Sequence, residues 1–156
     1  MDVGQLAPDF TLPSNGGGEI TLSKLRGNMV VLYFYPKDMT PGCTTQAIDF
    51  SSLKKDFDAC GAKIIGVSKD TPARHDKFIE KHDLTITLAS DEEGEMMEDY
   101  GVWILKKLYG REYMGIQRAT FLIGKNGDII EIWPKVRVKG HVDAVLAAVK
   151  TAASAK

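Results

Sequence analysis

The sequence of 156 residues is long enough for one domain with a full hydrophobic core and too short for a second domain of ordinary size, so we expect a single domain over residues 1–156. Its 44% hydrophobic content excludes wholesale disorder. The 20 Lys and Arg residues nearly balance the 21 Asp and Glu residues, and no segment collects basic side chains into a stripe, which argues against nucleic acids and anionic membranes as partners.

Features of the chain that report on its compartment favour the cytoplasm. Residues 1–5 lack the basic and apolar regions of a secretory signal, and the longest apolar run, residues 29–35, is too short to cross a bilayer. Two cysteines, Cys43 and Cys60, cannot build the disulfide framework of a secreted domain. We therefore expect a cytoplasmic protein whose cysteines serve chemistry or packing.

The first predicted elements form a β-hairpin. The breaker cluster Asn-Gly-Gly-Gly at residues 15–18 is typical of a tight turn between strands at residues 10–12 and 19–22. Residues 21–26 then predict a short helical turn that ends at Gly27. An N-terminal β-hairpin therefore precedes the rest of the fold.

A buried strand and a long helix follow. Residues 29–35 form a continuous run of β-branched and aromatic side chains stopped by a proline, which is typical of a strand buried on both faces of a parallel sheet. After a loop, Phe50, Leu53 and Phe57 recur at steps of three and four residues. This spacing predicts one helix over residues 43–60.

The rest of the chain alternates predicted strands with predicted helices. The strands cover residues 63–68, 86–90, 118–123 and 129–133. The helices cover residues 71–82, 92–100 and 141–153. An Asn-Gly turn signal joins the last two strands into a hairpin. This order favours an α/β fold of the thioredoxin-like type, with a central mixed β-sheet flanked by helices.

Cys43 stands where the buried strand gives way to the long helix. A sulfur at that place lies among unpaired backbone N–H groups and at the positive end of the helix dipole, and both favour the thiolate over the thiol. The thiolate is the nucleophilic form of cysteine. Gly42 lets the backbone come close to the reacting atoms, and Thr40 can aim a hydroxyl into the same pocket as donor and acceptor. These residues predict a nucleophilic cysteine site.

Arg118 is the candidate partner of this sulfur. Charge develops on the group that leaves when a thiolate attacks, so a fixed donor should face the site. Arg118 stands at the start of the strand predicted over residues 118–123, and it would lie beside Cys43 if that strand neighbours residues 29–35. Its guanidinium would then hold the thiolate and orient the substrate.

Residues 33–47, Tyr-Phe-Tyr-Pro-Lys-Asp-Met-Thr-Pro-Gly-Cys-Thr-Thr-Gln-Ala, resemble the active-site segment of the bacterioferritin comigratory protein (peroxiredoxin Q) branch of the AhpC/TSA peroxiredoxins. The family's Pro-x-x-x-Thr-x-x-Cys pattern falls on Pro36, Thr40 and Cys43, and its arginine falls on Arg118. Similar segments at residues 7–10, 66–68 and 113–116 extend the resemblance over nearly the whole chain.

The resemblance implies a function and a set of roles. It implies a thioredoxin-like peroxidase that reduces hydrogen peroxide and organic hydroperoxides, with no cofactor, through a cysteine sulfenic acid that thioredoxin or a similar thiol recycles. Such an enzyme serves antioxidant defence and redox homeostasis. Cys43, Thr40 and Arg118 would be catalytic, and Pro36 and Gly42 would bind the substrate. Members of this branch are often monomers, so we expect a monomer, with a weak dimer as the alternative.

The chain departs from the family pattern in its second cysteine. Many members carry a resolving cysteine five residues after the first, where this chain has Ile48, and others carry it near residues 78–80, where this chain has none. Cys60 would lie roughly 25 Å from Cys43 along an unbroken helix, whereas a disulfide needs Cα atoms within about 7 Å. We therefore expect Cys60 to pack in the core and Cys43 to follow a one-cysteine cycle, with an intermolecular bridge through Cys60 as the alternative.

Two other functions compete with a thiol peroxidase. A thiol–disulfide oxidoreductase needs a Cys-x-x-Cys motif, but position 46 is Gln46, which we expect to be a structural hydrogen-bonding residue near the pocket. A thioredoxin-like binding module in which Cys43 is incidental is the non-enzymatic alternative.

Two further groups of side chains could serve either a functional site or the packing of the fold. His75 and His82 lie on one predicted helix, but without a carboxylate or cysteine at ligand spacing we expect no metal site. Trp103, Tyr109 and Tyr113 either line a surface for the substrate or a partner, or pack in the core and at its rim.

Overall fold

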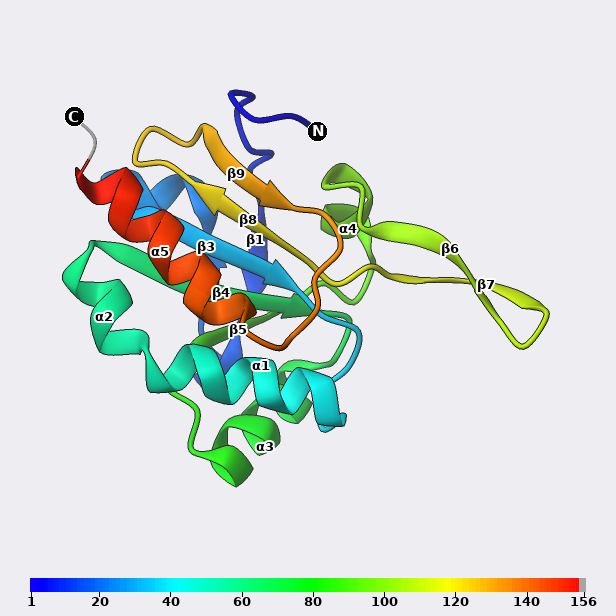
Figure 1. The fold of residues 1–156 in the computed structure, drawn as a ribbon. Coiled ribbons are helices and arrows are strands. Elements are labelled where there is room, and N and C mark those ends of the chain that lie inside the picture. The colour runs from blue at the N-terminus through cyan, green and yellow to red at the C-terminus, as the bar shows by residue number, and fades with distance from the viewer. Residues whose placement is uncertain (155–156) are drawn as a thin grey trace.

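The computed structural model describes residues 1–154 and centres on a five-stranded sheet (Figure 1). In spatial order, its strands are β5 (Thr87–Ser90), β4 (Ala62–Ser68), β3 (Met29–Phe34), β8 (Ala119–Ile123) and β9 (Ile129–Trp133). β4 is parallel to β3 and β5, whereas β8 is antiparallel to β3 and β9. The mixed sheet and the α/β class predicted from the sequence are confirmed.

Helices and two hairpins surround the sheet. The helices are α1 (Pro41–Ser52), α2 (Lys54–Ala59), α3 (Pro72–His82), α4 (Glu95–Asp99) and α5 (His141–Ser154), with short 3₁₀ turns η1 (Asn15–Gly17) and η2 (Leu22–Leu25). The hairpins are β1 (Thr11–Pro13) with β2 (Glu19–Thr21), and β6 (Trp103–Leu108) with β7 (Arg111–Ile116). The predicted N-terminal hairpin and the helical turn after it are therefore confirmed. Along residues 1–154, no helix combines the length and the apolar character that a membrane span requires.

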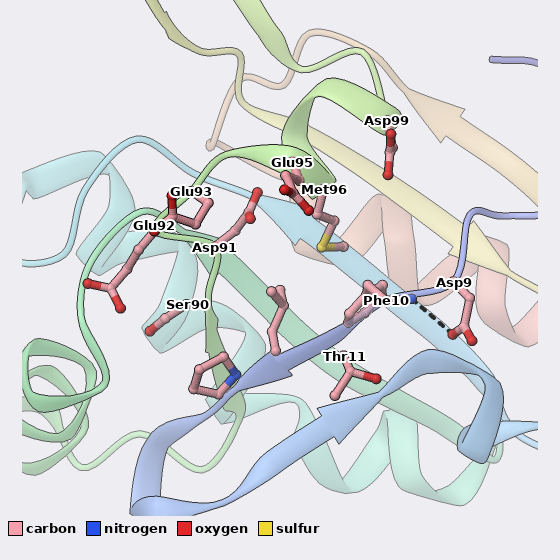
Figure 2. A pocket seen from close by; sticks show the side chains of 12 residues that line it. Asp9, Phe10, Thr11, Ser90, Asp91, Glu92, Glu93, Glu95, Met96 and Asp99 are labelled. Atoms are coloured by element: carbon pink, nitrogen blue, oxygen red, sulfur yellow. Dashed lines mark hydrogen bonds between the residues drawn. The ribbon is translucent and has the colours of Figure 1, made fainter.

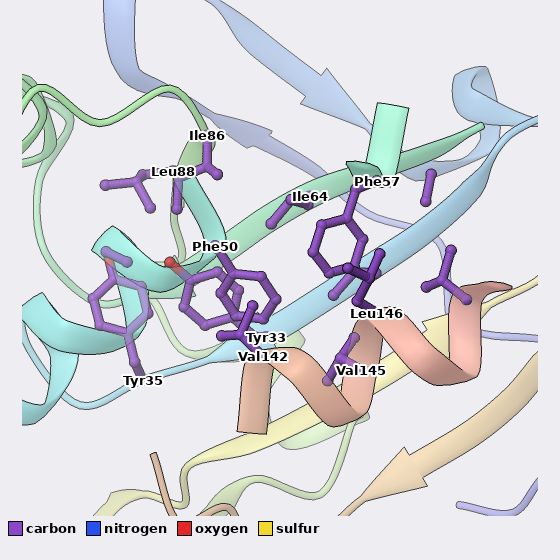
Figure 3. Close-up of a cluster of buried hydrophobic side chains, with 14 of the residues drawn as sticks. Tyr33, Tyr35, Phe50, Phe57, Ile64, Ile86, Leu88, Val142, Val145 and Leu146 are labelled. Atoms are coloured by element: carbon purple, nitrogen blue, oxygen red, sulfur yellow. The ribbon is translucent and has the colours of Figure 1, made fainter. Parts of the chain in front are cut away.

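β3 is buried along its whole length and divides the core into two layers. Val31 and Tyr33 belong to a cluster with α1, α2, α3 and α5, whereas Val30 and Leu32 belong to a cluster with α4 and the N-terminal segment. Figure 3 shows the first cluster, in which the ring of Phe50 from α1 stacks on Tyr33 with 4.6 Å between the ring centroids. Four helices therefore cover one face of the sheet, and this is the face that α1 and its cysteine share.

The single helix predicted over residues 43–60 is wrong in its length and its continuity. The helix begins earlier, because Pro41 fits the first helical position, and it breaks at Leu53, whose φ of −103° and ψ of 8° lie outside the helical range. Near the break the carbonyl of Ser51 accepts a hydrogen bond from the hydroxyl of Thr85 at 3.3 Å, which competes with the helical ladder. The distance expected between the two cysteines along one straight helix therefore does not apply.

The hairpin of β6 and β7 has no counterpart among the sequence predictions. It projects from the body of the protein beyond α4 (Figure 1). Its turn is formed by Tyr109 and Gly110, which have positive φ angles of 51° and 77°. Positive φ at both central residues suits a two-residue hairpin turn, but a tyrosine there gives no recognisable turn signal in the sequence.

We predict that Phe50→Ala destabilises the fold by about 3–5 kcal/mol, because it empties the centre of the cluster in Figure 3. Urea unfolding followed by circular dichroism measures the change. Ile48→Ala, two residues away on the same helix and 41% exposed, is the matched control, with a loss below about 1 kcal/mol. Equal losses in the two variants would contradict the assignment of Phe50 to the core.

Candidate active site

Cys43 lies in the first turn of α1, where the chain has just left β3. The helix starts at Pro41 after the N-cap residue Thr40, so the sulfur lies near backbone N–H groups that have no partner within the helix. Its side chain is 2% exposed and belongs to the same cluster as Tyr33 and Tyr35. In such a nearly dry pocket a charge interaction is stronger than in water.

Arg118 reaches Cys43 from the neighbouring strand. It precedes β8, whose first residue, Ala119, pairs with Phe34 at the end of β3. From there Nη2 of Arg118 donates to Sγ of Cys43 at 3.3 Å, and Nη1 donates to Oε1 of Gln46 at 2.7 Å. The strand that follows Arg118 thus neighbours the strand that precedes Cys43, which is the condition the sequence analysis set for bringing the two side chains together.

Two residues of α1 fit closely around the guanidinium. Gln46 is fully buried one helical turn after Cys43, and its Nε2 has no hydrogen-bond partner among residues 1–154. A Cβ at Gly42 would lie 3.2 Å from Nη2 of Arg118, so glycine leaves room for the approach. Sequence reasoning placed Gln46 near the pocket but did not pair it with Arg118; its three-residue spacing from Cys43 was the available signal.

Thr40 and Pro36 lie in the loop before α1. The Thr40 hydroxyl donates to the carbonyl of Lys37 at 2.8 Å and forms no hydrogen bond to the sulfur within the described residues. Pro36 is exposed at the start of the loop. The structure therefore brings Cys43, Arg118 and Gly42 into contact and places Thr40 and Pro36 on the loop that leads to them.

Lys106 of β6 is a second cation near this site, and sequence reasoning missed it. Burial lowers the pKa of Lys106, the Arg118 guanidinium lowers it further, and the Cys43 sulfur acts in the opposite direction. His141 lies nearby with Nε2 2.8 Å from the hydroxyl of Thr120. Burial, aided by Arg118, lowers the pKa of His141 to about 4, so its imidazole is neutral at neutral pH. Arg118 is therefore the cation that contacts the sulfur, and Lys106 adds a positive charge that interacts electrostatically with both groups.

A buried cluster of Asp38, Asp70 and His75 brings possible metal-ligand atoms within 4.8 Å of one another. However, Oδ2 of Asp38 lies 2.7 Å from Nδ1 of His75, whereas two ligand atoms of a tetrahedral zinc ion are roughly 3.3 Å apart. These groups are hydrogen-bonded to one another rather than spaced around an ion. The carboxylate that the sequence analysis found lacking near His75 comes from the loop before α1.

A separate cavity of about 360 Å³ lies between β1 and α4 (Figure 2). Its apolar lining includes Phe10 and Met96, which belong to the cluster on the face of the sheet opposite Cys43. The rest of the lining is rich in carboxylates: Asp9, Asp91, Glu92, Glu93, Glu95 and Asp99. This acidic cavity is thus separated from the cysteine site by the sheet.

Comparisons with known proteins identify a family that the chain matches over most of its length. The model of the AhpC/TSA family matches residues 3–132. The chain is similar to peroxiredoxin Bcp of Bacillus subtilis, with 50% identity over 96% of both chains, and to peroxiredoxin Bcp of Escherichia coli, with 38% identity over 94% of both chains.

Solved structures show the same likeness in three dimensions. The bacterioferritin comigratory protein of Xanthomonas campestris, studied for its alkyl peroxide reduction activity, superposes with a TM-score of 0.89 at 43% identity, over 93% of this chain and 92% of that one. A cysteine-to-serine mutant of Xylella fastidiosa PrxQ superposes with a TM-score of 0.92 at 36% identity, over 97% of this chain and 96% of that one. The thioredoxin-like architecture is therefore confirmed over nearly the whole chain.

We predict that Arg118→Ala slows the alkylation of Cys43 by iodoacetamide about tenfold, because the sulfur loses its charge-assisted hydrogen bond from the guanidinium. The rate of alkylation is measured in a Cys60→Ser background that leaves one sulfur. Arg111→Ala, which removes an exposed arginine of β7, is the control and should leave the rate unchanged. An unchanged rate in Arg118→Ala would show that the guanidinium does not activate the sulfur.

Proposed function

Because the chain belongs to the AhpC/TSA family, and within it to the Bcp or peroxiredoxin Q branch, it is a thiol-dependent peroxidase, and we propose that Cys43 is the sulfur that reduces the peroxide. The observation that supports this assignment best is the 3.3 Å contact between Sγ of Cys43 and Nη2 of Arg118 in a pocket nearly closed to water. A buried sulfur beside a fixed guanidinium is suited to react as an anion.

The proposed reaction begins with attack of the Cys43 thiolate on the terminal oxygen of a hydroperoxide. A sulfur–oxygen bond forms and the O–O bond breaks, so that the sulfur is oxidised to a sulfenic acid. The other oxygen leaves as alkoxide or hydroxide and takes up a proton to become the alcohol or water. The Arg118 guanidinium, already directed at the sulfur, stabilises the negative charge as it moves from sulfur to the leaving oxygen. Hydrogen peroxide and organic hydroperoxides both fit this scheme.

Thr40 is proposed to orient the peroxide. Since its hydroxyl proton is directed at the carbonyl of Lys37, the free lone pairs of Oγ1 remain as acceptors for the O–H of the substrate. Gly42 and Pro36 are proposed to shape the place where the substrate binds, Gly42 by leaving space next to the guanidinium and Pro36 at the exposed start of the loop.

A one-cysteine cycle is proposed for the return of the sulfenic acid to the thiol. Cys60 precedes Ala62, which pairs with Met29 at the start of β3, whereas Cys43 follows the end of the same strand. The length of β3 separates the two places by roughly 16 Å at about 3.3 Å per residue, well above the roughly 7 Å that a disulfide allows. The two cysteines are thus held apart by the length of β3 and not by an unbroken helix. An external thiol then forms a mixed disulfide with release of water, and a second thiol frees Cys43.

The family is reduced by thiols, and thioredoxin or a similar thiol donor is the reductant proposed for this chain. Both cysteines are free, as suits a reducing compartment, so the cytoplasm is the proposed location. A monomer is the proposed form. Because Cys43 has no resolving cysteine in reach, a second peroxide can convert the sulfenic acid to sulfinic acid.

The one-cysteine cycle predicts different outcomes for the two cysteines in a peroxide-consumption assay with dithiothreitol. Cys43→Ser abolishes turnover, because it removes the nucleophile, whereas Cys60→Ser retains it. Non-reducing mass spectrometry after one equivalent of peroxide should find a sulfenic acid on Cys43 in the wild type. A high yield of an intramolecular bridge between Cys43 and Cys60 would refute the cycle, and an intermolecular bridge through Cys60 would identify the alternative. No turnover in the wild type would support a non-catalytic module.

Arg118→Ala is predicted to lower the second-order rate constant for peroxide by about 10²-fold, the scale for removing a preorganised donor to developing charge. Arg118→Lys keeps the positive charge but loses the second nitrogen with which the guanidinium binds Cys43 and Gln46 at once. We therefore expect a rate constant between those of the wild type and Arg118→Ala. Stopped-flow mixing with hydrogen peroxide and with an organic hydroperoxide measures both variants. A wild-type rate constant in Arg118→Ala would remove this residue from the reaction.

A further inference from the structure

The loop between β3 and α1 has a conformation that requires an anchor. Met39 is not a glycine, yet it has a φ of 66°, in the left-handed region. That conformation is unfavourable for an L-residue, so the surrounding contacts must hold it. The loop leads directly to Cys43, and any relaxation of Met39 would move the start of α1.

Asp38, the residue before Met39, is the point at which this loop is fixed. Its side chain is buried, Oδ1 accepts the hydroxyl of Tyr35 at 2.6 Å, and Oδ2 lies 2.7 Å from Nδ1 of His75. Its backbone N–H donates to Oδ2 of Asp70 at 2.8 Å. One loop residue is thus tied to the end of β3, to α3 and to the segment after β4.

The hydrogen-bonding neighbours of the buried His75 ring show where its protons lie. Nε2 of His75 lies 3.1 Å from the carbonyl oxygen of Ala89, and since a carbonyl only accepts, Nε2 carries a proton. One further proton lies between Nδ1 of His75 and Oδ2 of Asp38, because two acceptors would repel at 2.7 Å. Every side-chain nitrogen and oxygen of this pair therefore has a hydrogen-bond partner, as a buried pair requires.

We propose that Asp38 and His75 form a positioning pair that holds the loop so that Sγ of Cys43 stays aligned with Arg118, and that it does so through hydrogen-bond geometry rather than through charge. The inference rests on the proposed role of Cys43. Neither residue contacts the sulfur by a hydrogen bond in the described part of the chain, so the pair acts through the loop. A displacement of about 1 Å at a reacting atom is enough for a large loss of rate.

The test compares Asp38→Asn with Asp38→Ala. In the asparagine variant Oδ1 still accepts from Tyr35, and Nδ2 donates to Nδ1 of a neutral His75 that keeps its proton on Nε2, so every bond of the pair is retained without its charge. In the alanine variant the Tyr35 hydroxyl and Nδ1 of His75 both lose Asp38, and the only contact left between them is their own, at 3.4 Å. We expect the rate constant for peroxide to stay within about threefold of wild type in Asp38→Asn and to fall about tenfold or more in Asp38→Ala.

Three further measurements separate positioning from loss of the fold. Nuclear magnetic resonance should detect in the wild type the proton shared between Nδ1 of His75 and Oδ2 of Asp38, and in Asp38→Asn Nδ1 should carry no proton while the rate constant is kept. Tyr35→Phe removes one hydroxyl and keeps the ring, and it should lower the rate constant for peroxide by a few-fold. This variant serves as the test if Asp38→Ala fails to fold. Glu80→Ala, an exposed change on α3, is the control and should leave the rate constant unchanged.

Two results would overturn the positioning pair. A loss in Asp38→Asn equal to that in Asp38→Ala would make the charge, not the geometry, responsible, and a wild-type rate constant in folded Asp38→Ala or in Tyr35→Phe would show that the loop needs no such anchor. Both are distinct from failure of the proposed function, which would appear as an inactive wild type or an active Cys43→Ser.

Discussion

The antiparallel pairing of β3 with β8 is the constraint on which the cysteine site depends. The register sets Phe34 opposite Ala119, so the residue before β8, Arg118, emerges at the end of β3 where α1 begins. A slip of one residue would turn its side chain to the other face of the sheet, away from Cys43. The contact between guanidinium and sulfur is therefore fixed by backbone hydrogen bonds of two strands that lie far apart in the sequence.

The reactive sulfur is also part of the hydrophobic core, so packing and chemistry share side chains. Cys43 belongs to the cluster of Tyr33 and Phe50, and the ring of Tyr33 in turn lies against Gly66 of β4, where an added Cβ would be only 2.6 Å from the ring carbon Cζ. A larger residue at Gly66 would therefore push Tyr33 toward Cys43 and its helix. Residues that never touch a peroxide thus constrain where the sulfur lies.

Local patterns in the sequence were sufficient for the sheet and for placing Cys43 where a strand gives way to a helix, because buried strands form continuous apolar runs, although the helix starts at Pro41 rather than at Cys43. The position of Arg118 was expected from the family motif, and the strand pairing supplied its physical reason. The break at Leu53 and the turn at Tyr109 could not be predicted, since each depends on contacts or backbone angles without a local signal. The partnership of Asp38 with His75 joins residues distant in sequence, so the histidine alone gave no indication of it.

The hairpin of β6 and β7 extends from the body with two free edges, since neither strand pairs with a further strand among residues 1–154. Leu105, Leu108 and Met114 are each about half exposed on it, a combination of apolar surface and open backbone that invites edge-to-edge association of copies. Lys107 and Arg111 lie on the same two strands. Cationic side chains on an edge disfavour the addition of another strand, so the same hairpin carries apolar surface that favours pairing with a copy and charges that oppose it.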